Sequence, residues 1–249
     1  MSNNLLNYTL RIADNALILG QRMSEWCSNG PTLEEDIAMV NISLDLFGQA
    51  NGFYEYASII EKKKSADDFA FLRSEREYFN NLLVEQKNGH FGDTIVRNFL
   101  FDAYSVLFYT KLKDSLDETL SALGAKSLKE AKYHLRHSSS WLIRLGDGTD
   151  ESNAKVQKSL NDIWSFTGNL FEMDDIDLEL YKLGIAVDNK SLKSDWDKKV
   201  NEVLSESKLK RPDDGYMHTG SNKGMHTEHL GHLLSNMQFL QRAHPNAKW

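Results

Sequence analysis

The sequence predicts an all-α fold, and three observations support this. Apolar residues recur at intervals of three and four along most of the chain, the spacing of an amphipathic helix. No stretch of useful length alternates polar and apolar residues as a half-buried strand does. Proline, the strongest helix breaker, occurs three times in 249 residues.

The first helix is expected over residues 7–26, where Leu10, Ala13 and Leu17 form an apolar stripe. The sequence SNGP at 28–31 then breaks the helix, and Thr32 is placed to cap the next one. That second helix is expected over 33–63. A third, shorter run of half-buried character follows at 67–85.

The middle of the chain predicts two long helices, over 91–113 and 120–145. The first is strongly apolar, and the second ends at the glycine signal GDG of 146–148. Four further segments are expected to be helical. They are 152–171, a short acidic run at 173–181, a charged helix at 191–204 and a last helix at 226–243.

The composition argues against some classes of binding partner and indicates the cellular compartment. Acidic residues outnumber basic ones, 36 against 29, so the net charge is −7; this argues against nucleic acid or an anionic membrane as partner. The single cysteine, Cys27, rules out an intrachain disulfide. No apolar run approaches the roughly 20 residues of a membrane span, and the first residues do not resemble a signal peptide. We therefore expect a cytoplasmic protein.

Each of four predicted helices carries one acidic residue beside its apolar stripe, and the fourth also carries a histidine. Four helices that each present an acid or a histidine to a common centre are typical of a ferritin-like bundle with a carboxylate-bridged metal pair. The candidate residues are Asp14, Asp45, Asp102, Glu130 and His134.

This ligand set is incomplete. Such a site usually needs Glu-x-x-His on two helices, but the chain has Asp45-x-x-Gly48 and Glu130-x-x-Tyr133, with His134 one place too late. We therefore predict a buried polar network at a vestigial metal site, with no metal and no catalytic residue in this chain. The alternative is an autonomous di-iron oxidase or monooxygenase that uses the same five residues.

A second cluster of metal-ligand type lies near the C-terminus, at His226, His229 and His232. These histidines lack the His-Glu-x-x-His order of a zinc protease helix. Helix caps, hydrogen bonds or an interface are the expected roles, and a metal site is the alternative.

Several blocks of the sequence resemble the C-type subunits of phenylacetyl-CoA epoxidase complexes, in order and in spacing. The likeness extends over nearly the whole chain. The blocks are YTLRIADN (8–15), ISLDLFGQA (42–50), RSEREY (73–78), FGDTI (91–95), KEAKYH (129–134) and HTEHLG (226–231).

This resemblance implies a non-catalytic, structural ferritin-like subunit. Its partners would be a related catalytic subunit that holds the di-iron cofactor and the other subunits of the complex, with a homodimer when it is isolated. The complex inserts one oxygen atom into the ring of phenylacetyl-CoA, giving the 1,2-epoxide in aerobic phenylacetate breakdown. We expect one domain over 1–249, with a core bundle at about 5–147 and additional helices at about 150–249.

Overall fold

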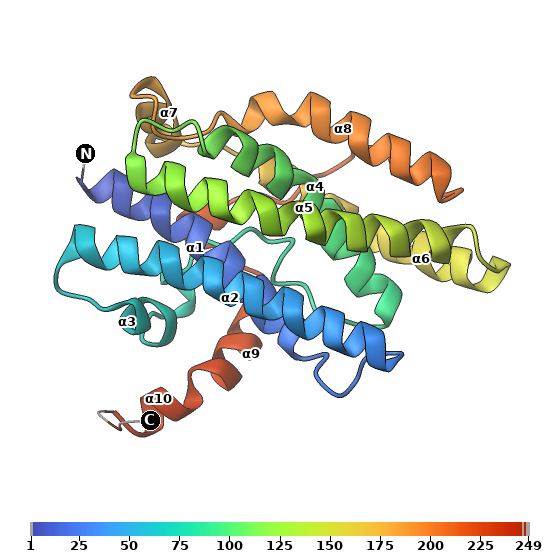
Figure 1. Cartoon of the computed structure of the whole chain (residues 1–249), viewed down its shortest axis with the longest axis horizontal. Helices are drawn as coiled ribbons and strands as arrows, with labels where there is room; N and C mark the ends of the chain where they lie inside the picture. Colours follow the sequence, from blue (N-terminus) through green and yellow to red (C-terminus); the bar gives the residue numbers. More distant parts are fainter. Residues whose placement is uncertain (1, 246, 248–249) are drawn as a thin grey trace. The chain divides into compact units, whose positions relative to one another are not determined.

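The computed structural model describes residues 2–245 and 247, and all regular secondary structure in them is helical (Figure 1). Within these residues, ten α-helices and three 3-10 turns follow one another without a strand. The predicted all-α, ferritin-like class is confirmed. The structure is built from long antiparallel helix pairs, which are the units of such a bundle.

The chain divides into two compact units. The first comprises the residues up to Gln86 together with those from Gly220 onward, and the second is Lys87–Thr219. The expectation of one domain with a core at about 5–147 stays a prediction.

Unit 1 is built on α1 (Ser2–Ser24) and α2 (Leu33–Glu61), which run antiparallel (Figure 1). The two helices approach closely at Gly20, where a Cβ would lie 3.0 Å from the ring of Phe47. At the same point the Ser43 hydroxyl donates to the Gly20 carbonyl at 2.8 Å. The small residue thus lets the two backbones pack, and the helix boundaries lie close to the predicted ones.

The third predicted helix, 67–85, is wrong beyond its first turns. Helix α3 (Ala66–Phe71) is short and is followed by a single 3-10 turn, η1 (Glu75–Glu77). The rest of the segment is irregular but buried, because its backbone groups find partners outside a helix. The backbone N–H of Phe79, for example, donates to the Asp14 carboxylate at 2.8 Å.

The last predicted helix, 226–243, is divided into α9 (Glu228–Met237) and α10 (Phe239–Ala243). The break falls at Gln238, whose side chain is buried. Its amide donates to the backbone carbonyl of Arg73 at 3.1 Å. This contact holds the C-terminal segment against the irregular part of unit 1.

Unit 2 is built on α4 (Phe91–Leu112) and α5 (Glu118–Gly146), again antiparallel (Figure 1). Gly124 allows their close approach, since a Cβ there would lie 3.0 Å from the backbone nitrogen of Lys113. The other elements of this unit are α6 (Asp150–Ile163), the 3-10 turn η2 (Trp164–Phe171), α7 (Asp175–Lys182) and α8 (Asn189–Glu206).

Helix α8 is fixed to α4 by Trp196, a large and fully buried side chain in unit 2. Its indole N–H donates to the carbonyl of Leu100 at 3.0 Å, so that the polar atom of the ring is satisfied. None of the helices described in the two units is both long and apolar enough to cross a bilayer.

Candidate functional site

Asp14, the first predicted site residue, is completely buried in unit 1 and is fully hydrogen-bonded by protein groups. Arg73 contacts both carboxylate oxygens, with Nη1 at 3.1 Å from Oδ2 and Nη2 against Oδ1. The Tyr54 hydroxyl donates to Oδ1 at 2.6 Å, and the N–H of Phe79 donates to Oδ2 at 2.8 Å. Asp14 therefore already has a cation and two further donors.

The Arg73 side chain is also buried and is held from several sides. It donates to the carbonyls of Phe69 at 2.6 Å and Glu77 at 2.8 Å. Its guanidinium also lies 4.2 Å from the centre of the Tyr78 ring, a cation–π contact. Burial lowers the pKa of Arg73, but the Asp14 carboxylate, together with Tyr54 and Tyr78, raises that pKa above its usual value.

Tyr54 completes this group. Burial raises the pKa of its hydroxyl well above the usual value, and the neighbouring Asp14 charge raises it further. The hydroxyl therefore stays protonated and acts as a donor. Asp14, Tyr54 and Arg73 together form a charge-neutral buried cluster, and sequence reasoning did not identify Arg73 as the counter-ion.

Asp45, the acid predicted on α2, lies in a different environment. Its side chain is half-buried, whereas Asp14 is fully buried. Gly48, which stands where a Glu-x-x-His motif would place its histidine, is exposed, and a Cβ there would meet no atom within 4 Å. The α2 position of the motif therefore supplies no imidazole.

Asp102 is buried in unit 2, on α4, and accepts a hydrogen bond of 2.7 Å from the Ser138 hydroxyl on α5. His134, also buried, is close enough for its charge to act on this carboxyl group. Burial raises the pKa of Asp102 to about 6, although His134 and the Ser138 hydrogen bond act in the opposite direction. The structure thus brings two of the candidate residues, Asp102 and His134, into one buried environment.

Glu130 belongs to the same helix, α5, but contacts a different partner. It is half-buried, and its charge, after burial itself, raises the pKa of the buried Tyr109 hydroxyl. Tyr133, at the position of the missing histidine, is 38% exposed and lies under the Arg136 guanidinium, 5.4 Å from its ring centre. On α5, the position where Glu-x-x-His would place its histidine therefore lies at the surface and holds a tyrosine.

These residues do not fit a di-iron centre. Among residues 2–245 and 247, no group of three or more His, Cys, Asp or Glu side chains is arranged to hold a metal ion. Asp14 is already neutralised by a guanidinium, and Asp102 faces a histidine and a serine. That all five predicted residues form one network stays a prediction, since they are divided between the two units.

Asp102 gives a test of this polar network. Its folded-state pKa of about 6 is above its ordinary value of 3.8, so the folded protein binds this proton more tightly than the unfolded chain does. The contribution of Asp102 to the free energy of unfolding therefore falls as pH rises from about 4 to about 6. We expect Asp102→Asn to be more stable than the unsubstituted protein at pH 8, by about 1–3 kcal/mol, because a buried charge is removed.

Urea unfolding at pH 4, 6 and 8 measures this difference, which should vanish near pH 4. Asp114→Asn, at an exposed position, is the control and should change little at any pH. A less stable Asp102→Asn at pH 8 would show that the charge forms a favourable pair with His134.

The C-terminal histidines do not form one site. His226 has no exposed side-chain surface, and both of its ring nitrogens face acceptors: Nδ1 lies 2.8 Å from Glu85 Oε2, and Nε2 lies 2.8 Å from the Tyr78 carbonyl. Because both partners are acceptors, both ring nitrogens donate when the imidazole is protonated. Burial lowers the pKa of His226, but the Glu85 hydrogen bond and charge, together with the Tyr78 carbonyl and the Asp14 charge, raise that pKa.

Glu85 is the centre of this second buried cluster, and sequence reasoning missed it. Besides His226, its carboxylate accepts from the Thr227 N–H at 2.6 Å, the Thr227 hydroxyl at 2.8 Å and the Asn80 amide at 2.9 Å. The Arg22 guanidinium donates to the Glu85 backbone carbonyl at 2.8 Å. For His226, the expected hydrogen-bonding role is confirmed.

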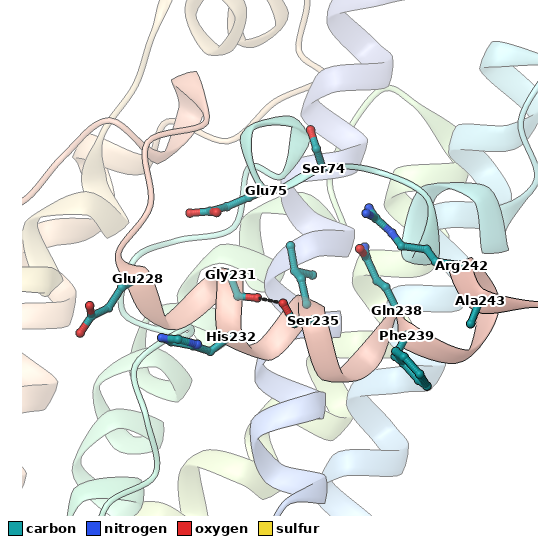
Figure 2. Close-up of a pocket in the computed structure, with 11 residues that line it drawn as sticks. Ser74, Glu75, Glu228, Gly231, His232, Ser235, Gln238, Phe239, Arg242 and Ala243 are labelled. Atoms are coloured by element: carbon teal, nitrogen blue, oxygen red, sulfur yellow. Dashed lines mark hydrogen bonds between the residues drawn. The ribbon is translucent and has the colours of Figure 1, made fainter.

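His232, in contrast, is exposed and lines a groove of about 1000 Å³ along α9 and α10. Figure 2 shows it beside Glu228 at one end of the groove, with Phe239 and Arg242 at the other end. The groove is open, and both polar and apolar residues line it. His226 is buried against Glu85 and Tyr78, so His226 and His232 have separate environments.

Comparison with known proteins shows the family of this chain. A family model described as "Phenylacetic acid catabolic protein" matches residues 1–249. The chain belongs to this family. One curated family relative, the C-type subunit of the 1,2-phenylacetyl-CoA epoxidase of Escherichia coli (strain K12), is 48% identical over 247 residues, which is 99% of this chain and 100% of the relative. The family resemblance predicted from the sequence blocks is confirmed.

Proposed function

We propose that this chain is a non-catalytic, structural subunit of a multicomponent phenylacetyl-CoA 1,2-epoxidase. It pairs with a related catalytic subunit that holds the di-iron cofactor, and it stabilises that subunit in aerobic phenylacetate catabolism in the cytoplasm. The relative that is 48% identical over its whole length is itself named as a subunit of this epoxidase, which supports the assignment to the complex.

The observation that carries the non-catalytic role is the ion pair of Asp14 and Arg73. In a carboxylate-bridged metal pair, the charge of each acid is balanced by metal cations. Here a buried guanidinium takes that role at Asp14, contacting both of its oxygens. A metal ion at this carboxylate would have to displace a buried arginine, which would be left without its counter-ion at a cost of several kcal/mol.

A structural role is also consistent with the polar groups that remain. Acids that no longer bind metal would be costly inside a helical unit unless they were paired. Asp14 is paired with Arg73, and Asp102 is hydrogen-bonded and has a raised pKa of about 6. The helices therefore keep their packing without a metal, which is what a supporting subunit requires.

Iron analysis tests this function. The chain is produced alone in iron-rich medium and measured by mass spectrometry of the metal, and then co-produced with the catalytic subunit and the other epoxidase subunits. We expect iron far below one atom per chain when it is alone. We also expect co-elution with the catalytic subunit and epoxidase turnover only in the assembled complex.

The same experiment examines the alternative. An autonomous di-iron oxidase would bind roughly two irons per chain, as a bundle-core metal pair requires. It would lose them on Asp102→Ala and would turn over without partners. Either result would overturn the structural role, and failure to co-elute with the other subunits would overturn the assignment to the complex.

A further inference from the structure

From Lys126 to Arg144, the exposed charged residues of α5 are all basic, whereas an exposed acid, Glu118, stands at the start of the helix. Five cations lie on this surface over about 27 Å of helix, at 1.5 Å per residue. Their spacings of three, four and eight residues place them on the side of the helix opposite its buried residues. We call these residues the α5 cationic face: Lys126, Lys129, Lys132, Arg136 and Arg144.

None of these five side chains forms an ion pair within the described part of the chain, although Glu130 stands four residues from Lys126. Two of them contact aromatic rings instead: Arg136 lies over Tyr133 at 5.4 Å, and Arg144 lies over Trp141 at 5.4 Å. Glu130, the acid between them in sequence, is half-buried and acts on Tyr109. The α5 cationic face is therefore an uncompensated positive surface on a chain with a net charge of −7.

Other surface helices of unit 2 are built differently. On α6, Lys155 pairs with Glu151 and Lys158 pairs with Asp162. On α8, Lys198 pairs with an acid three residues away. Those lysines follow the usual pattern of a solvated helix, with opposite charges three or four residues apart. On α5 the same spacings place three like charges together, at Lys129, Lys132 and Arg136, which is unfavourable for an isolated helix.

We propose that the α5 cationic face docks an acidic face on another protein subunit of the epoxidase assembly. This inference rests on the proposed function for the identity of the assembly. Charge complementarity specifies the partner's chemistry: a row of aspartate and glutamate residues that extends along the helix. Tyr133 and Trp141, interleaved with the cations, supply apolar contact of the kind that protein interfaces favour.

A protein partner fits this surface better than a polyanionic ligand does. The face is the convex side of a helix, so it offers no cavity to enclose a phosphorylated small molecule. The net charge of −7 opposes the approach of nucleic acid or an anionic membrane, whose charge is extended well beyond one helix face. A compact acidic patch on a protein can contact the cations of this face without approaching the acidic residues elsewhere on the chain.

The test compares the full-length chain with the triple variant Lys126→Glu, Lys129→Glu, Lys132→Glu. The remaining epoxidase subunits, purified without this chain, are immobilised, and association is followed by surface plasmon resonance at 50 and 300 mM KCl. The control is Lys158→Glu, Lys190→Glu, Lys198→Glu, which makes the same change in net charge at other exposed positions of unit 2. Circular dichroism checks that each variant is folded.

We expect the association rate of the triple variant to fall at least about tenfold at 50 mM KCl, while the control falls much less. The unsubstituted chain should also associate more slowly at 300 mM. A milder triple variant, with Gln at the same three positions, should show an intermediate loss, and it replaces the Glu variant if that one does not fold.

Each other outcome counts against the proposal. Binding by the triple variant equal to that of the control would overturn it and leave the proposed function intact. Absence of binding by the unsubstituted chain would overturn both. Binding of a 20-base-pair DNA duplex that depends on these lysines, with subunit binding unaffected, would assign the face to nucleic acid instead.

Discussion

Asp14→Ala is expected to destabilise the protein by about 3–5 kcal/mol, the cost of breaking a buried ion pair from one side. The substitution removes the carboxylate that the structure places against the Arg73 guanidinium, which is 4% exposed. It also removes the acceptor of the Tyr54 hydroxyl and of the Phe79 N–H. Urea unfolding at pH 7 measures the loss as a lower transition midpoint.

The double variant Asp14→Leu, Arg73→Met separates the ion pair from the packing around it. Removing both partners leaves no unpaired charge, so most of the lost stability should return. Asp114→Ala, at an exposed position, should stay within about 0.5 kcal/mol of the unsubstituted protein. A single variant as stable as this control would mean that Arg73 finds another counter-ion, and the argument against a metal at Asp14 would fail.

Glu85→Ala should have an effect of similar size, about 3–5 kcal/mol, because His226 and Thr227 lose a shared buried acceptor. The loss of stability should first appear as local opening near the start of α9. Hydrogen exchange in α9 should become faster, since the start of this helix is held by Glu85. Glu85→Gln keeps a carbonyl acceptor without the charge and should lose less, about 1–3 kcal/mol.

The same cluster predicts a pH dependence. The pKa of His226 is raised in the folded state above its usual value of 6.5. Its contribution is therefore complete below about pH 6.5 and is lost as pH rises through the folded-state value. The charged groups around it are Glu85 and, further away, Asp14. The stability difference between the unsubstituted protein and His226→Gln should be larger at pH 6 than at pH 9; equal differences would contradict this.

Helix periodicity predicted most of the fold because the long helices follow local rules. The stripe of apolar residues and the Thr32 cap of α2, which accepts from the Glu35 N–H, are determined by neighbours in the sequence. The segment after residue 71 has no such local signal. Its conformation depends on contacts with Asp14 and other groups far away in the sequence, so the pattern alone predicted a helix.

The candidate site was predicted in part for the same reason. Asp14 and Asp102 were singled out because an acid within an apolar helix face is unusual and must have a partner. Their hydrogen-bond donors were not identified: Arg73 lies 59 residues from Asp14, and Ser138 lies 36 residues from Asp102. Glu85 gave no signal at all, because it belongs to a segment that is irregular and yet buried.

The bonds that join Glu85 to residues 141 and 142 positions later also constrain biosynthesis. A ribosome must translate all of unit 2, Lys87–Thr219, before the segment that closes unit 1 emerges. The intervening unit is contiguous and can become compact during translation. The amino-terminal segment, although made first, can therefore complete its packing only after the residues from Gly220 onward have left the ribosome.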